Sequence, residues 1–188
     1  MQTYRIHTLD SAPEKSRPAL QSLQQAVGRI PNLAATMAAS PTLISGFVGA
    51  FGNFHGGTFT GAQKQTLLLT NAVTNTCVWA VAFHSTLALA EGVDAEHVRA
   101  IREGRLPADP ELAALSRFTR ALIERRGHLS EGELAEFTAA GFTSAQVLEV
   151  IAGLAVSVMA NYAGNITRPE LEAPFRPQAW SGAARAAH

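Results

Sequence analysis

The chain of 188 residues is long enough to bury a substantial core without disulfides or metal ions. Its composition, 47% hydrophobic and 16% charged, favours a packed globule over a disordered chain. Fifteen Lys and Arg residues balance fifteen Asp and Glu residues, with no basic block, so we expect no nucleic-acid partner.

The first part of the chain predicts an extended arm followed by short helices. Residues Met1 to Pro13 contain Tyr4, Ile6 and Leu9 at spacings that suit an arm anchored on an apolar surface. Glycines, prolines and the capping residue Ser40 then bound three expected helices. These run from Glu14 or Arg17 to Val27, from Leu33 to Ala39, and from Pro41 to the Gly56-Gly57 pair.

The central segment predicts two helices separated by a break. Thr60 and Gln63 form a capping-box pattern, so a helix should begin near Gly61. The run from Thr74 to Thr76 competes with helical hydrogen bonds, and we expect the break there. Cys77 would then lie in the first turn of the second helix, where free amides and the helix dipole favour a thiolate.

The second half of the chain predicts four helices and an extended tail. Each helix starts at a capping residue or pattern: Asp94, Asp109-Pro110, Ser130 with Glu133, and Thr143 with Gln146. The last of them, from Ala145 to about Tyr162, is apolar nearly all round, which places it in the core or at a subunit interface. Three prolines after Asn165 predict a tail that runs extended, with Phe175 and Trp180 as anchors.

No strand pattern of useful length occurs, so the predicted fold class is all-α. We interpret residues 1–188 as one domain, with an N-terminal helical part at 1–59, a core at 60–165 and an extended tail at 166–188. The uncharged run between Lys64 and Glu91 raises a membrane question, but polar residues interrupt it, so we read it as a buried core element and expect no membrane partner.

Compartment and assembly follow from smaller signals. The N-terminus lacks the apolar segment of a signal peptide, and the single cysteine cannot form an internal disulfide, so we expect a cytoplasmic protein. Only 16% of the residues are charged, so little of the surface has to face water. This favours an oligomer in which one face of each chain is buried. The six histidines show no ligand-like spacing, so we expect neither a metal site nor a cofactor.

The candidate chemistry lies in the central segment. Cys77 and His84 are seven residues apart, so a helix would place them on one stripe, about two turns from each other. Their rise of ~10.5 Å means that a water molecule or a substrate would have to bridge them.

These residues resemble the carboxymuconolactone decarboxylase and alkyl hydroperoxidase D-like (AhpD-like) family. The resemblance covers almost the whole chain and includes Ile30 to Leu33, Ser40-Pro41, the segment from Gln65 to His84, Ala140 to Thr143, and Asn161-Tyr162. It implies an all-α, AhpD-like helical fold and a homo-oligomer, commonly a trimer or a hexamer. In the peroxidase branch, a Cys-x-x-Cys pair reduces peroxides while a glutamate and a histidine relay protons.

The resemblance to that catalytic motif is partial. Cys77 matches the first cysteine, His84 matches the histidine, and Trp79 lies where an aromatic residue is common. The second cysteine, which meets the peroxide, corresponds to Ala80, and the glutamate corresponds to Gln65. Alanine cannot form a sulfenate or a disulfide, and glutamine can orient a neighbour but carries no titratable proton.

Three functions remain open at this stage. The first is a peroxidase-related, antioxidant oxidoreductase with a degenerate thiol site, in which Cys77 acts weakly alone on a peroxide or not at all. The second is a decarboxylase or lyase that uses His84 on a small organic acid or lactone, because histidine titrates near neutrality. The third is a non-catalytic oligomer that binds a small molecule. Each of these residues also has a purely structural interpretation. A buried cysteine is usually inert, and Trp79 is typical of packing at a pocket wall. Gln65 is equally typical of a solvated helix surface.

Overall fold

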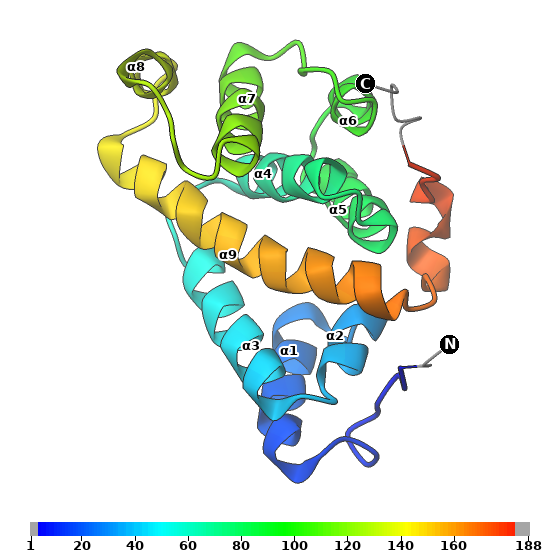
Figure 1. Cartoon of the computed structure of the whole chain (residues 1–188). Helices are drawn as coiled ribbons and strands as arrows, with labels where there is room; N and C mark the ends of the chain where they lie inside the picture. Colours follow the sequence, from blue (N-terminus) through cyan, green and yellow to red (C-terminus); the bar gives the residue numbers. More distant parts are fainter. Residues whose placement is uncertain (1–3, 183–188) are drawn as a thin grey trace.

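The computed structural model describes residues 4–182 of the chain, and every regular element within that range is a helix (Figure 1), as the all-α prediction requires. The elements are η1 (Glu14–Ser16), α1 (Arg17–Val27), α2 (Asn32–Met37), α3 (Pro41–His55), α4 (Gly61–Thr74), α5 (Val78–Ala90), α6 (Ala95–Arg102), α7 (Pro110–Glu124), α8 (Glu131–Ala139), α9 (Ser144–Thr167) and η2 (Ala173–Gln178).

Local capping signals set where several helices begin. Thr60 caps α4, and its side chain accepts from the amide of Gln63 while the Gln63 side chain accepts from the amide of Thr60. The same reciprocal pair forms at the starts of α8 and α9. The three predicted capping boxes are therefore confirmed, because a capping box needs only residues three apart in the chain.

The predicted break between α4 and α5 is confirmed. The α4 helix ends at Thr74, and the side chains of Thr74 and Asn75 bond back to backbone carbonyls of the last turn. Thr76 has a φ of 52°, in the left-handed region, and this turns the chain so that Cys77 becomes the N-cap of α5.

Helix α9 runs through the middle of the molecule, with α1 to α3 on one side and α4 to α8 on the other (Figure 1). It packs against α3, α4, α2 and α5. It extends to Thr167, five residues beyond the predicted end near Tyr162. By length and mean hydropathy (1.6) α9 could cross a membrane, but a core helix passes the same test, and 39% of its most apolar window is buried inside this fold.

The predicted extended tail is interrupted by a short helix, while residues 168–172 and 179–182 form no regular element. Residues Ala173–Gln178 form η2, a short 3₁₀ helix, because proline is tolerated in a first helical turn. Phe175 of η2 is buried against α5, while Arg102 of α6 donates to the carbonyls of Gln178 and Ala179. The ends of the expected arm and tail, 1–3 and 183–188, lie outside the described residues.

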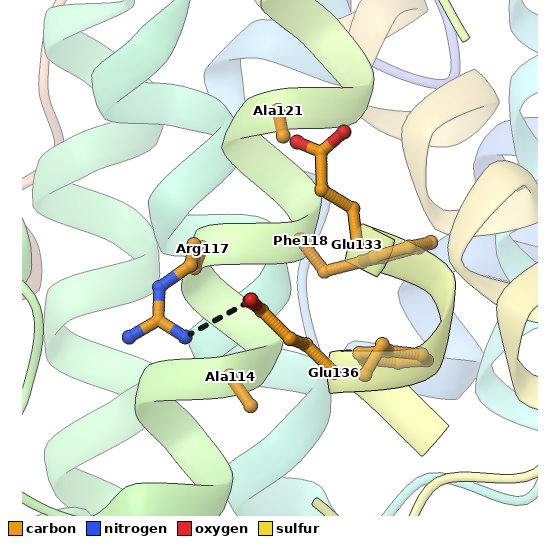
Figure 2. Close-up of a pocket in the computed structure, with 7 residues that line it drawn as sticks. Ala114, Arg117, Phe118, Ala121, Glu133 and Glu136 are labelled. Carbon is orange, nitrogen blue, oxygen red and sulfur yellow. Dashed lines mark ion pairs between the residues drawn. The ribbon is translucent and has the colours of Figure 1, made fainter. Parts of the chain in front are cut away.

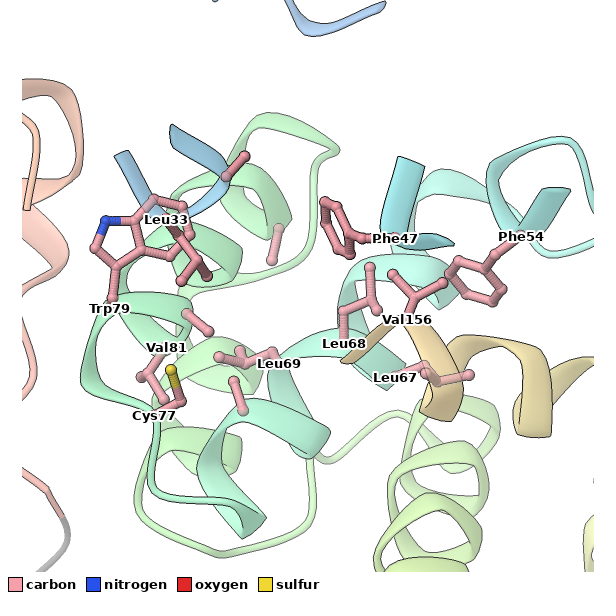
Figure 3. Close-up of a cluster of buried hydrophobic side chains, with 14 of the residues drawn as sticks. Leu33, Phe47, Phe54, Leu67, Leu68, Leu69, Cys77, Trp79, Val81 and Val156 are labelled. Atoms are coloured by element: carbon pink, nitrogen blue, oxygen red, sulfur yellow. The ribbon is translucent and has the colours of Figure 1, made fainter. Parts of the chain in front are cut away.

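The core is built around α4 and its contacts with α5, α7 and α9. Leu67 and Leu69 of α4 are fully buried, and Figure 3 shows them in the same apolar cluster as Cys77 and Val81. The side chains of α4 that face α5 and α9 also include polar groups, and these bring the candidate site together.

Candidate functional site

A largely apolar hollow lies where α1, α2 and α3 meet α4, α5 and α9. Its empty space is about 560 Å³ when the open solvent at its mouth is counted, and about 50 Å³ of this admits the centre of a water-sized molecule. Fifteen residues line this hollow, which we call the His84 pocket. They are Leu23, Val27, Pro31, Leu33, Ala34, Phe47, Phe51, Leu68, Trp79, Ala80, Phe83, His84, Val156, Ser157 and Ala160.

His84 is held in one orientation by Gln65. Its Nδ1 lies 3.0 Å from Oε1 of Gln65, which is buried on α4. Because this oxygen accepts a hydrogen bond, Nδ1 carries the ring hydrogen, and Nε2 is left as the nitrogen with a free lone pair. Gln65 therefore acts as an orienting residue, the role that the sequence assigned to an amide at this position.

The apolar surroundings keep His84 uncharged. Burial is the main cause that lowers the pKa of His84 from 6.5 to about 3, and repulsion from His55 contributes a smaller part of the same shift. Burial also lowers the pKa of His55, which stacks on Phe51 and donates from Nδ1 to the Phe51 carbonyl. At neutral pH the pocket thus presents a neutral imidazole that accepts a hydrogen bond.

Cys77 does not line the His84 pocket. It is 1% exposed, and its Sγ packs against Gly164 of α9 and near Leu33 of α2. Burial raises the pKa of the Cys77 thiol, and the opposing effect of the Ala80 and Trp79 amides is smaller. The expectation that the helix start favours a thiolate is therefore wrong, because desolvation outweighs the helix N-terminus here.

Trp79 forms one wall of the pocket and is fixed by the tail. Its indole Nε1 donates to Oε2 of Glu172, and Oε1 of the same carboxylate accepts from the amide of Asn32. The indole ring stacks on Phe83, and Phe175 of η2 meets both rings edge-on. The tail thus holds the aromatic wall in place.

The structure therefore brings four of the five candidate residues together and separates the fifth. Trp79, Ala80 and His84 line the pocket, and Gln65 supports His84 from behind. Cys77 lies on the same stretch of chain, but its sulfur is sealed among apolar neighbours.

Sequence reasoning missed Ser157 and His55. Ser157 faces the pocket from α9, and its only signal in the sequence is a hydroxyl residue inside an otherwise apolar run. His55 of α3 stacks on Phe51, which lines the pocket, and nothing in its spacing along the chain links it to His84.

A second hollow lies between α7 and α8, far along the chain from these residues. Figure 2 shows it lined by Arg117 and Glu136, which form an ion pair 3.9 Å long, and by Glu133. Both members of the pair are mostly exposed, so the pair contributes little to stability. The carboxylate of Glu133 pairs with Arg125 and accepts hydrogen bonds from Ser130. We assign no chemistry to this hollow.

Among the residues that the structure describes, no cluster of three or more His, Cys, Asp or Glu side chains could hold a metal ion. The His84 pocket offers one imidazole and one hydroxyl, which do not form a metal site of the usual kind.

No protein-family model matches the sequence, and no curated protein matches it. Solved structures resemble the fold closely. An AhpD-core, uncharacterised peroxidase-related protein from Ralstonia eutropha superposes with a TM-score of 0.79 at 17% identity, over 92% of this chain and 93% of that one. A peroxidase-related protein from Silicibacter sp. gives 0.75 at 13% identity, over 92% and 93% of the two chains.

A third similar structure is a cysteine-to-alanine variant of the debrominase Bmp8 in complex with 2,3,4-tribromopyrrole. Its TM-score is 0.77 at 19% identity, over 95% of this chain and 96% of that one. At these identities the likeness concerns the fold, and the fold of this chain is AhpD-like.

Proposed function

We propose that this protein, built on the AhpD-like fold, binds a small neutral ring compound in the His84 pocket and does not work as a thiol peroxidase. The observation that carries the proposal is that Ala80 and His84 line the pocket while Cys77 does not. In the peroxidases that the sequence resembles, a sulfur would stand at position 80. Here a methyl group stands there, and the remaining thiol is buried elsewhere.

The state of His84 supports a ligand that carries an N–H or O–H group. With Nδ1 donating to Gln65, the lone pair of Nε2 is the acceptor that the imidazole offers. A pKa of about 3 makes His84 a weak base, so it accepts a hydrogen bond and polarises the ligand without taking its proton at neutral pH.

The lining of the pocket supports a neutral ligand. None of the fifteen lining residues, all within the described part of the chain, is charged. An ionised carboxylate would lose its hydration in this pocket and find no cationic partner there. This desolvation costs roughly several kcal/mol in an apolar environment. This argues against the alternative of a decarboxylase or lyase acting on an ionised organic acid.

The aromatic walls support a flat ring. Phe47, Phe51, Trp79 and Phe83 surround the hollow, and rings of this kind favour stacked or edge-on contacts with another ring. The Bmp8 variant, which has a similar fold, is in complex with 2,3,4-tribromopyrrole, a flat ring.

The proposal is tested by fluorescence titration with 4-bromophenol and 4-bromoanisole. Bromine quenches indole emission, and a Trp180→Phe background leaves Trp79 as the only tryptophan. The two ligands differ in the O–H donor, so we expect 4-bromophenol to bind about tenfold more tightly, the effect of one hydrogen bond of about 1.4 kcal/mol.

Variants separate the two candidate residues. His84→Leu should abolish the preference for the phenol, whereas Cys77→Ser should leave it unchanged. Binding should not vary between pH 5 and 8, because His84 stays neutral throughout that range. A preference that survives in His84→Leu, or peroxide turnover with a small thiol that disappears in Cys77→Ser, would contradict the proposal.

A further inference from the structure

Ser157 places a second polar group in the His84 pocket. It lies on α9, is 4% exposed, and lines the pocket across from α5. Its Oγ has no hydrogen-bond partner within the protein. The neighbours that line the pocket beside it on α9, Val156 and Ala160, offer only apolar surface.

The Ser157 hydroxyl lacks the hydrogen bond that helix hydroxyls commonly make. Serine and threonine in helices usually bond back to a carbonyl one turn earlier, as Thr74, Thr86 and Thr138 do in this protein. Ser157 does not, and a buried hydroxyl without a hydrogen bond is destabilising. The group is therefore free to donate to whatever occupies the pocket.

Position distinguishes Ser157 from the other buried polar atoms without partners. Within residues 4–182 these are Thr66 Oγ1, Asn71 Nδ2 and Thr119 Oγ1, and none of the three residues lines the His84 pocket. Among these four residues, Ser157 is the one that lines the hollow.

We propose that Ser157 is a specificity-determining residue whose hydroxyl donates a hydrogen bond to an acceptor on the bound ring compound. The inference rests on the proposed function and narrows its ligand class. The ligand is a neutral ring compound that offers an N–H or O–H group to His84 and, separately, a carbonyl or ether oxygen to Ser157. The two residues are complementary, since one accepts and the other donates.

The test uses acetophenone and α-methylstyrene, two rings of nearly the same shape. The carbonyl oxygen of the first is replaced by a CH₂ group in the second, and neither carries a donor for His84. Each is titrated against the Trp180→Phe protein by the change in Trp79 fluorescence. The ratio of the two dissociation constants isolates the acceptor oxygen, because the remaining contacts cancel.

We expect Ser157→Ala to reduce the preference for acetophenone over α-methylstyrene about tenfold. Ser85→Ala is the matched control, because Ser85 is a buried serine on α5 whose hydroxyl accepts from Arg102 outside the pocket. It should leave the ratio unchanged. Ser157→Ala removes an unpaired group, so it should also fold at least as well as the wild type.

The hydroxyacetophenone isomers then combine both groups. The isomer that binds most tightly should lose affinity in both Ser157→Ala and His84→Leu. If Ser157→Ala leaves the ratio of the acetophenone and α-methylstyrene dissociation constants unchanged, the role of Ser157 is overturned. The preference for the phenol is tested separately by His84→Leu. Failure of every ring compound to bind overturns both proposals.

Discussion

The most informative residues are the two that the sequence paired by spacing, Cys77 and His84. Both belong to one short stretch of chain, yet the thiol is enclosed by apolar neighbours and the imidazole lines a pocket. The sulfur is packed against a backbone glycine, and burial raises its pKa. The imidazole borders a hollow and is oriented by an amide. Desolvation opposes charge on both side chains, which removes a thiolate and leaves a neutral acceptor.

The low pKa of His84 predicts acid-sensitive stability. Its pKa is about 3 in the folded protein and 6.5 in the reference state, so between these values the unfolded chain binds more protons. The free energy of unfolding should therefore fall as the pH drops from 6.5 towards 3, by up to about 1.4 kcal/mol per pH unit from this group. Urea unfolding at pH 4 to 7 measures the slope.

His84→Gln should flatten that slope by removing the titrating group. The control is His128→Gln, which removes an exposed histidine between α7 and α8. Equal slopes in the two variants would show that His84 is not held neutral by burial.

At the scale of elements, the close approach of α9 to the start of α5 decides where the thiol points. Gly164 has no side chain, and the Cys77 sulfur fills the space next to it. Leu33 of α2 closes the same space. The N-cap position of α5, Cys77, is thus covered by two other helices, while Trp79, Ala80 and His84 of α5 line the pocket.

Gly164→Ala should destabilise the protein through this contact. A β-carbon at position 164 would lie 2.7 Å from the Cys77 sulfur, so one of the two must move. We expect the free energy of unfolding to fall by about 1–3 kcal/mol, the usual effect of overpacking. Adding Cys77→Ala should restore most of the loss, because it removes the sulfur.

Gly153→Ala provides the matched control on the same helix. Its β-carbon would lie 2.8 Å from the side chains of Leu67 and Phe54, and Cys77→Ala should not rescue it. Equal stability of Gly164→Ala and wild type in urea would argue against the packed position of the thiol.

At the scale of the whole molecule, α9 has two faces with different roles. One face is buried against the helices on both sides and carries Ser157 and Asn161. The other exposes large apolar side chains at Leu148, Ile151, Tyr162 and Ile166. No charged residue occurs between Glu149 and Arg168. Leu148, Ala155 and Tyr162 repeat every seven residues, the spacing of a helix face that packs on a second helix.

We therefore expect a second copy of this chain to cover the exposed face of α9. A self-complementary stripe without charge suits a symmetric contact between identical helices. A double variant, Ile151→Glu with Tyr162→Glu, should lower the molar mass measured by light scattering to that of one chain, while secondary structure by circular dichroism is retained.

Leu134→Glu tests the specificity of that effect, because Leu134 is an exposed apolar residue on α8, away from the stripe. A molar mass of one chain for the wild type at micromolar concentration, or an unchanged mass in the double variant, would contradict assembly through α9.

The sequence by itself determined the helices and the break before Cys77, because both depend on hydrogen bonds between residues close together in the chain. A capping box joins residues three apart, and threonine and asparagine compete with helical hydrogen bonds wherever they cluster. The resemblance along almost the whole chain, with Cys77 and His84 at the places of the family motif, was sufficient to predict the AhpD-like fold. The missed 3₁₀ helix at Ala173–Gln178 has a different origin, since its hydrophobic anchor, Phe175, is fixed by α5.

Only the tertiary structure decided which side chains share the pocket. Spacing along one helix puts Cys77 and His84 on a common stripe, but the residue that covers each position comes from another helix. Gly164 covers the thiol, and Gln65 orients the imidazole. Ser157 enters the pocket from α9, so no pattern local to α5 contains it. Burial and hydrogen bonding depend on these contacts between distant segments. They keep His84 uncharged, and they keep the Cys77 thiol protonated and out of the pocket.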